Sequence, residues 1–471
     1  MTPRICVRIV VVVSMFLTLV GVSPAADVAR DDGSIDLATA ARVAAKHMLR
    51  SQPPGTFTVG DGRAIVDPTD NQVLYYHFDL TPQGYVMVPA SMALPPVIAY
   101  SFTGTVPADG EAADPLHRLL LLDLRSRLGH LDVLTPETNA DRQAEWRRLA
   151  GLDVSPTGDR GFEQWPPSGS TPTGGWVLTQ WNQSSPYNAL CPTDPVSHAR
   201  SVAGCPAVAM AQIVNYHARL NGKQFDDTDD YYHSYAGRNY WIDDDHTAQD
   251  FPSFPQLNTY LDSLFDKYHH GNGPDSTERA ALIFACGVAA RQVYTSGASG
   301  TFSVSQAKDA YGKFNCGAAE LLYQESVGPY PRMMQNMIDA YPAHLAIVDP
   351  TWSSGHNVVV DGYNTNGYYH INFGWSGAYD GWYRLPAELP YSLTVVEGII
   401  VDIMIEPCGP MDCNCDGLVN LHDLDYFVEC YSGPAGTFTA PGCTSFDAEP
   451  DDDVDLQDFA LFQALFGDAA M

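Results

Sequence analysis

The chain has 471 residues, of which 45% are hydrophobic and 17% are charged. This composition can fill folded cores, so it excludes a disordered, collagen-like or coiled-coil protein, and the length allows about three domains. Fifty-six acidic residues against 25 basic ones give a net charge of -31. Such a charge argues against nucleic acid as a partner, because phosphate binding depends on Lys and Arg. It favours solubility, calcium binding or both.

Residues 1–26 have the form of a secretory signal peptide. Arg4 and Arg8 precede an uncharged run over residues 9–22, and small residues follow it. A membrane anchor is the alternative, but it needs about 18 or more apolar residues and this run is shorter. We therefore expect a secreted, extracellular protein with no membrane span once the signal is removed. Export also permits disulfides among the remaining cysteines.

Residues 27–165 carry no pattern that indicates chemistry. They begin with helical spacing of apolar residues over 37–48 and continue with strand signals. A turn containing Pro and Gly inside residues 73–88 predicts a β-hairpin. Residues 161–175 are rich in Pro, Gly, Ser and Thr, which is the composition of a linker exposed to proteolysis.

Cys205 stands at the start of a predicted helix in the next segment, residues 170–406. Pro206 suits the first helical position, where no N–H donor is needed. The apolar residues at helical spacing are Ala207, Met210, Ala211 and Val214. The N–H groups and the dipole at a helix N-terminus favour the thiolate, which is the nucleophilic form of cysteine. From this helix alone, an inert core cysteine is an equally good interpretation.

His356 lies at the edge of a predicted apolar strand that continues to Tyr363. The Asn-Gly pair at 366–367 predicts a hairpin back into the strand that follows. An imidazole at such an edge can face a cleft. A thiolate and an imidazole from separate elements are what cysteine-dependent acyl transfer requires, since one attacks the carbonyl carbon and the other protonates the leaving amine. Taken singly, a histidine at a strand edge is more often structural.

The order of these motifs resembles the streptopain-like cysteine peptidases, which are secreted relatives of papain. The resemblance implies an α+β, papain-like fold with a helical part and an antiparallel β part. It also implies an endopeptidase that cleaves protein or peptide substrates through a thioester and needs no catalytic cofactor. The motifs that carry it are Gln180–Gln183, Pro186–Asn188, Gly204–Cys205, Ala209–Gln212, Ser296–Ala298, Gly355–His356, Asp361–Tyr363, Tyr369–Asn372 and Asp380–Gly381.

By this resemblance Cys205 is the nucleophile, His356 is its general base and acid, and Gln183 donates its side-chain amide to the oxyanion. Asn372 is a candidate for orienting the imidazole and Trp375 for shielding it. In a regular hairpin the position opposite His356 falls near Trp375, which leaves Asn372 about three residues, or ~10 Å, along the strand.

The chain departs from the family's Asn-Trp-Gly-Trp-Gly-Gly motif at Phe373 and Ser376. These departures keep open a non-catalytic adhesion or scaffold protein with the same fold, and an amidase or transpeptidase is a further alternative. The family places an inhibitory prodomain before the peptidase, which implies that residues 27–165 are a prodomain and that the protein is a zymogen. A permanent accessory domain is the alternative for this segment.

Residues 408–471 form an acidic segment without Lys or Arg. The loop beginning at Asp412 places oxygen donors at EF-hand positions 1, 3, 5, 9 and 12, and the pattern returns from Asp447 with Pro450 and Asp452 as irregular members. Two such units resemble a dockerin module, which implies structural calcium and a cohesin-like docking partner; an acidic turn without an ion is the alternative. The predicted ligands are Asp412, Asn414, Asp416, Leu418, Asn420, Asp423, Asp447, Glu449, Asp451, Asp453, Asp455 and Asp458.

Overall fold

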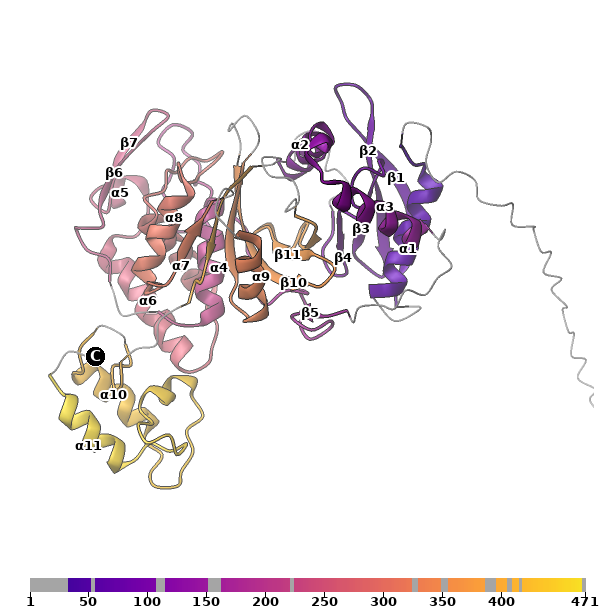
Figure 1. The fold of residues 1–471 in the computed structure, drawn as a ribbon. Helices are drawn as coiled ribbons and strands as arrows, with labels where there is room; N and C mark the ends of the chain where they lie inside the picture. The colour runs from indigo at the N-terminus through magenta and orange to yellow at the C-terminus, as the bar shows by residue number, and fades with distance from the viewer. Residues whose placement is uncertain are drawn as a thin grey trace, which may run out of the picture.

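The fold is known from a computed structural model (Figure 1). The predicted signal peptide lies outside the residues that the structure describes, and within those residues no helix is both long and apolar enough to cross a membrane. The described residues are 33–51, 56–106, 115–150, 162–220, 224–323, 329–348, 355–385, 395–404, 409–414 and 417–467.

The N-terminal part combines antiparallel strands with three helices. Apolar residues of the first helix, among them Val43 and Met48, are buried against the strands together with Trp146. The hairpin expected from the turn signals is present, since Tyr75 pairs with Pro89 and Asp79 with Tyr85. Its elements are α1 (Leu37–Ser51), β1 (Thr58–Val66), β2 (Val73–Thr81), β3 (Tyr85–Pro89), β4 (Ala99–Ser101), α2 (Pro115–Gly129) and α3 (Pro136–Ala150).

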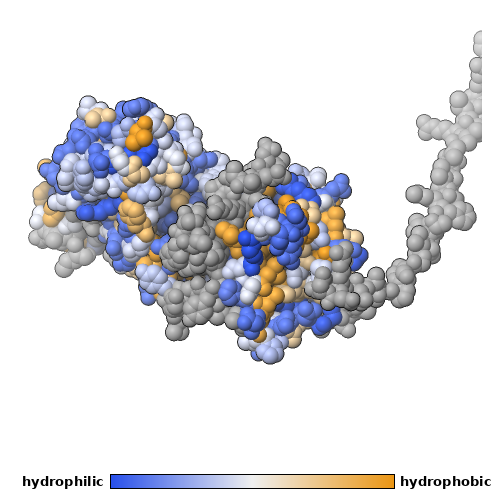
Figure 2. Space-filling model, turned by 90° about the horizontal axis from the view of Figure 1, so that it is seen from above, coloured by the Kyte–Doolittle hydropathy of each residue, from blue (hydrophilic) through white to orange (hydrophobic). Residues whose placement is uncertain are grey.

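The middle part begins with a helical half, on the left of Figure 1. Its central helix packs against its neighbours and against one face of the sheet, where Val359 of the sheet joins the helical core. Figure 2 shows mainly hydrophilic residues over this half, in keeping with the acidic composition. The elements are α4 (Cys205–His217), β6 (Tyr231–Tyr235), β7 (Arg238–Ile242), α5 (His246–Gln249), α6 (Phe254–His269), α7 (Ser276–Ala289) and α8 (Val304–Tyr311).

The strands of the middle part continue the N-terminal sheet without a break. The order is β1-β2-β3-β4-β12-β11-β10-β9-β13-β8 in one 11-stranded sheet, with β5 paired to β10. The junction is the pair β4 and β12, where Ala99 lies opposite Tyr383. The later elements are β5 (Gln164–Trp165), β8 (Glu320–Leu322), α9 (Pro329–Ile338), β9 (Ala343–Val348), β10 (Gly355–Asn364), β11 (Tyr368–Asn372), β12 (Gly381–Tyr383) and β13 (Val395–Val401).

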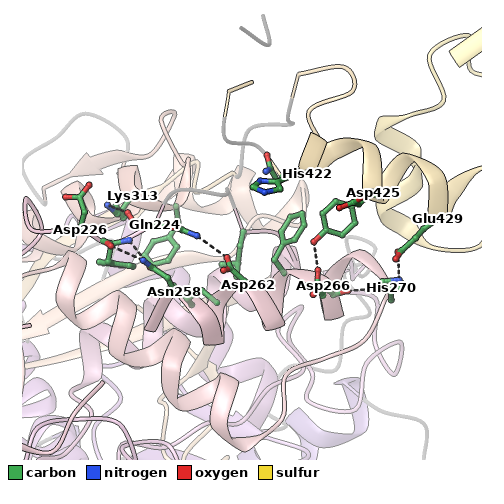
Figure 3. A pocket seen from close by; sticks show the side chains of 17 residues that line it. Gln224, Asp226, Asn258, Asp262, Asp266, His270, Lys313, His422, Asp425 and Glu429 are labelled. Carbon is green, nitrogen blue, oxygen red and sulfur yellow. Dashed lines mark hydrogen bonds and ion pairs between the residues drawn. The ribbon is translucent and has the colours of Figure 1, made fainter. Parts of the chain in front are cut away.

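The C-terminal module has two helices, α10 (Leu421–Cys430) and α11 (Leu456–Leu465), around a core of phenylalanines. A disulfide joins Cys430 to Cys443. The module lies below the helical half in Figure 1, and α10 faces α6 across a groove. Two contacts across this groove are the hydrogen bond from the hydroxyl of Tyr426 to Asp266 and the ion pair of His270 with Glu429, the second of which is labelled in Figure 3.

Candidate active site

Cys205 is the first residue of α4, as its position in the sequence predicts. Gly204 precedes it with φ 86° and ψ 134°, and Pro206 lies in the first turn. Cys205 is partly exposed, whereas the other free cysteines of the described residues are buried. The fold therefore leaves this thiol, among those described, within reach of a reaction partner.

Position 204 requires glycine for two reasons, its backbone conformation and the close approach of a neighbouring side chain. Its φ of 86° is one that side-chain-bearing residues rarely adopt, and an added Cβ would lie 2.4 Å from the side chain of Gln292. We expect Gly204→Ala to lower the free energy of unfolding by about 2–4 kcal/mol and to displace Cys205. Thermal or denaturant unfolding measures the loss. Gly273→Ala, where nothing lies within 4 Å, should change stability by less than about 0.5 kcal/mol; equal losses in the two variants would contradict this reason.

Asn357 lines the same small pocket as the Cys205 thiol, and its backbone and side chain favour the thiolate. Burial raises the pKa of the thiol above its ordinary value, and the bonds from Asn357 and from the N–H of Cys205 itself oppose that rise. The thiolate preference expected at a helix N-terminus is therefore offset here by loss of water. A partner base is needed to remove the proton.

A small pocket at the thiol brings three predicted residues together. Cys205 and Gln183 line it, and the backbone carbonyl of Gln183 accepts the N–H of Ala203 at 2.8 Å. The pocket is too narrow to hold a water molecule in this state. Its full lining is Gln183, Cys205, Val208, Ala209, Gln212, Asn357, Asn372, Phe373 and Gly374.

His356 is the residue before Asn357 on β10, so it lies one position along the chain from the lining of the thiol pocket. Its Nε2 lies 2.8 Å from the carbonyl oxygen of Phe373. A carbonyl oxygen only accepts hydrogen bonds, so Nε2 carries the hydrogen and, in the neutral ring, Nδ1 holds the lone pair. The ring stacks on Trp375 with centroids 4.4 Å apart, and the residue is only 4% exposed.

Asn372 lies where the hairpin register predicts. It pairs with Val359, three positions from His356, and an irregularity between Val360 and Gly362 adjusts the register. Its amide nitrogen donates to the carbonyl of Thr179 at 2.7 Å, and its Oδ1 accepts the Gly374 N–H at 3.0 Å. Asn372 therefore ties β11 to neighbouring backbone, whereas the Nε2 atom of His356 bonds to the backbone carbonyl of Phe373.

Two contributors to this site were not among the predicted residues, namely Asn357 and the carbonyl group of Phe373. A backbone carbonyl has no side-chain signature, so sequence motifs do not reveal it. The hairpin register was the one available signal, because it predicted that the position opposite His356 falls near Trp375, two residues from Phe373. Asn357 follows His356 directly, but only its contact with Cys205 shows its place in the site.

The two acidic loops of the C-terminal module repeat the same hydrogen bonds. Asp412 accepts the N–H of Gly417 at 3.0 Å, and Asp447 accepts that of Asp452 at 3.1 Å. Position 6 has a positive φ in both loops, 88° at Gly417 and 66° at Asp452. At position 12, Asp423 accepts from the backbone at 2.9 Å and its counterpart in the second loop, Asp458, at 2.8 Å. The second loop thus adopts the turn despite lacking glycine.

Carboxylates converge in the second loop. Ligand atoms of Glu449, Asp455 and Asp458 all lie within 4.8 Å of one another. Burial and the neighbouring carboxylates raise the pKa of Asp453. Oxygen donors of this kind suit Ca²⁺. In the first loop the predicted ligand Asp416 lies outside the described residues.

Comparison with known proteins identifies the class. Residues 181–383 match the model of the Peptidase C10 family. Streptopain of Streptococcus pyogenes serotype M1 is 23% identical over 338 residues, covering 68% of this chain and 75% of that protein. The thiol protease/hemagglutinin PrtT of Porphyromonas gingivalis is 24% identical over 319 residues, covering 66% of this chain and 33% of that protein. A solved fragment of prointerpain A from Prevotella intermedia aligns with 20% identity, 75% coverage of this chain, 100% of the fragment and a TM-score of 0.49.

The matched segment contains both the helix of Cys205 and the strand of His356, and it defines a papain-type cysteine peptidase. The mixed helical and antiparallel fold predicted from the sequence is confirmed. More particularly, the chain is a cysteine-type endopeptidase that is similar to streptopain, and its similarity to the C10 family lies within residues 181–383.

Proposed function

We propose that the protein is a secreted endopeptidase zymogen whose reaction depends on Cys205 and His356. The observation that carries this proposal is the single small site in which the partly exposed thiol at the start of α4 meets Gln183 and the backbone of the His356 strand. Protein or peptide chains are the substrates, as for the thiol proteases it resembles. The reaction needs no cofactor.

The first half of the reaction forms a thioester. Nδ1 of His356 takes the thiol proton of Cys205, and the sulfur attacks the carbonyl carbon of the peptide bond. The oxygen becomes an oxyanion, which accepts hydrogen bonds from the N–H of Cys205 and the side-chain amide of Gln183. When the C–N bond breaks, the imidazolium returns its proton to the leaving amine.

The second half hydrolyses the thioester. The neutral imidazole removes a proton from water, and the oxygen attacks the acyl carbon through a second oxyanion at the same donors. The C–S bond breaks, the carboxylic acid leaves, and the sulfur regains a proton. The carbonyl of Phe373 keeps the hydrogen on Nε2 throughout, and Trp375 covers the ring from water.

The N-terminal part, residues 27–165, is proposed to be the inhibitory prodomain. It forms the continuation of the sheet at β4 and β12, and it contacts the loop after β11. The hydroxyl of Tyr85 lies 2.8 Å from the carbonyl oxygen of Tyr379 and 2.7 Å from the hydroxyl of Tyr383. These contacts hold the N-terminal part against the residues that follow Phe373 on the peptidase side of the sheet.

An epoxide thiol trap tests the proposal. After activation, the protein should take up about one equivalent of the reagent at Cys205, because the other free cysteines of the described residues are buried. It should also hydrolyse casein. Cys205→Ala should show neither labelling nor hydrolysis. If the wild type cleaves casein no faster than Cys205→Ala, the protein is not a peptidase and the scaffold alternative holds.

The C-terminal module is proposed to bind structural calcium and to dock onto a cohesin-like partner. The paired loops support this, since each has the same turn and the same acceptor bonds at position 12. We expect removal of Ca²⁺ to destabilise the module by about 2–4 kcal/mol when the free ion exceeds the Kd by 100- to 1,000-fold.

Hydrogen exchange of the full chain, with and without a chelator, measures this loss residue by residue. The tryptophans all precede residue 383, so their fluorescence should report an unchanged peptidase. Asp458→Asn should remove the calcium response of the second loop, and Asp425→Asn, on the exposed side of α10, should keep it. Protection that does not depend on Ca²⁺ would contradict calcium binding.

A further inference from the structure

Three buried ionisable residues form a cluster that includes one residue of the strand that holds His356. His370 of β11 donates through Nδ1 to Asp361 of β10 at 2.6 Å, and neither side chain is more than 2% exposed. Asp380, in the loop before β12, is 1% exposed. The reaction outlined above uses none of these groups. Burying a charged group costs free energy unless hydrogen bonds and opposite charges compensate for it. We therefore expect a contribution of this cluster to the reaction.

Asp380 connects this cluster to the imidazole through one residue. Its Oδ1 accepts the N–H of Phe373 at 2.9 Å. The carbonyl oxygen of Phe373 accepts the Nε2–H of His356 at 2.8 Å. Phe373 is thus held at its N–H and holds the imidazole by its C=O, so a shift of Asp380 moves the acceptor that orients the ring.

Asp361 fixes the same region from the other side. Its Oδ2 accepts the N–H of Val177 at 2.9 Å, and its carbonyl accepts that of Trp176 at 2.8 Å. These residues lead into the stretch that ends at Gln183. His370 neutralises Asp361 and lies close enough to Asp380 to lower the pKa of that carboxyl. The cluster therefore joins the two strands of the hairpin to the segment carrying the oxyanion donor.

We propose that Asp380 is a positioning residue of the peptidase, which orients His356 by fixing Phe373, with the Asp361–His370 pair as its support. The proposal deepens the proposed function and rests on it, since it assumes that His356 is the base. Asp380 touches no substrate atom and acts only through Phe373.

The groups that face Asp380 decide its protonation. They are His370 and Asp361 on the hairpin, Gln180 at 3.5 Å, and the hydroxyls of Tyr85 and Tyr383. Burial raises the pKa of Asp380 to about 7, against the lowering effect of the Phe373 N–H and of His370. Below that pH the carboxyl gains a proton and becomes a weaker acceptor for Phe373. Activity should therefore fall as the pH drops through about 7.

The test measures kcat and KM of the activated full chain on a peptide between about pH 5 and 9. We expect Asp380→Ala to lower kcat by about 100-fold and Asp380→Asn, which keeps an acceptor oxygen, by about 10-fold, with little change in KM. In Asp380→Asn, moreover, the activity should no longer fall as the pH drops through about 7. Asp402 is the control, because its carboxylate is bonded to Asn336 away from the site. Asp402→Asn should leave kcat and its pH profile unchanged.

The outcomes separate the two proposals. Wild-type activity equal to that of Cys205→Ala overturns the proposed function and this inference with it. An active wild type with unchanged kcat in both Asp380 variants overturns the inference alone. A folded Asp380→Asn variant, judged by its thermal midpoint, that loses kcat but keeps the wild-type pH profile also overturns it, because a purely structural loss would leave the profile intact.

Discussion

His356→Ala is expected to lower kcat/KM for peptide hydrolysis by about 10³- to 10⁴-fold. The variant leaves the thiol of Cys205 without the group that takes its proton, and burial already raises the pKa of that thiol. It also removes the acid that protonates the leaving amine. The measurement is steady-state hydrolysis of a peptide by the activated protein, and the rate of Cys205→Ala serves as the background.

His217→Gln is the matched control for this loss. His217 ends the same helix that Cys205 begins, and its Nε2 bonds the carbonyl of Ile403 at 2.8 Å. The two residues lie at opposite ends of a 13-residue helix, about 18 Å apart, so the substitution should change kcat/KM by less than about twofold. Full activity in His356→Ala would assign the base to another residue and would refute the proposed dyad.

The part of the site formed by short-range patterns could be predicted from the sequence. Apolar residues at helical spacing and Pro206 placed Cys205 at the start of α4. The Asn-Gly turn predicted the hairpin, and the structure pairs Asn372 with Val359, three positions after His356, as expected. These features depend on neighbouring residues along the chain, so local rules are sufficient for them.

What could not be predicted depends on contacts between distant segments. The continuation of the sheet through Ala99 and Tyr383 joins strands 284 positions apart, and no local pattern specifies such a pairing. The bond of Asp380 to the Phe373 N–H is likewise visible only in the fold. The raised pKa of the Cys205 thiol differs from the simple expectation for a helix N-terminus, because burial acts in the opposite direction.

The acidic module illustrates both cases. The positions of its loops and helices follow from the repeated Asp pattern, and the second helix begins at Leu456, nine positions after Asp447. Pro450 and Asp452 made the second loop the weaker prediction, yet Asp452 takes the positive φ that glycine takes in the first. Asp is among the residues that tolerate this conformation, which explains why the turn survives.

Cutting the chain between the N-terminal part and the peptidase is expected to raise activity by up to about 10³-fold. A protease site inserted at residues 167–170 would lie in an exposed stretch, where Gly169 has no neighbour within 4 Å of an added Cβ. The tether holds the N-terminal part at an effective concentration of about 1 mM, and a cut at about 1 µM protein removes that advantage. Peptide hydrolysis before and after cutting measures the gain.

The uncut protein with the same insertion is the control, and it should stay as inactive as the parent. Tyr85→Phe should increase the gain after cutting, because it removes the hydroxyl that contacts Tyr379 and Tyr383 and so weakens docking by about 1–3 kcal/mol. The two changes act on the same equilibrium, one through the tether and the other through the sheet junction. Activity that is already full before the cut, and unchanged after it, would make residues 27–165 a permanent accessory domain rather than an inhibitor.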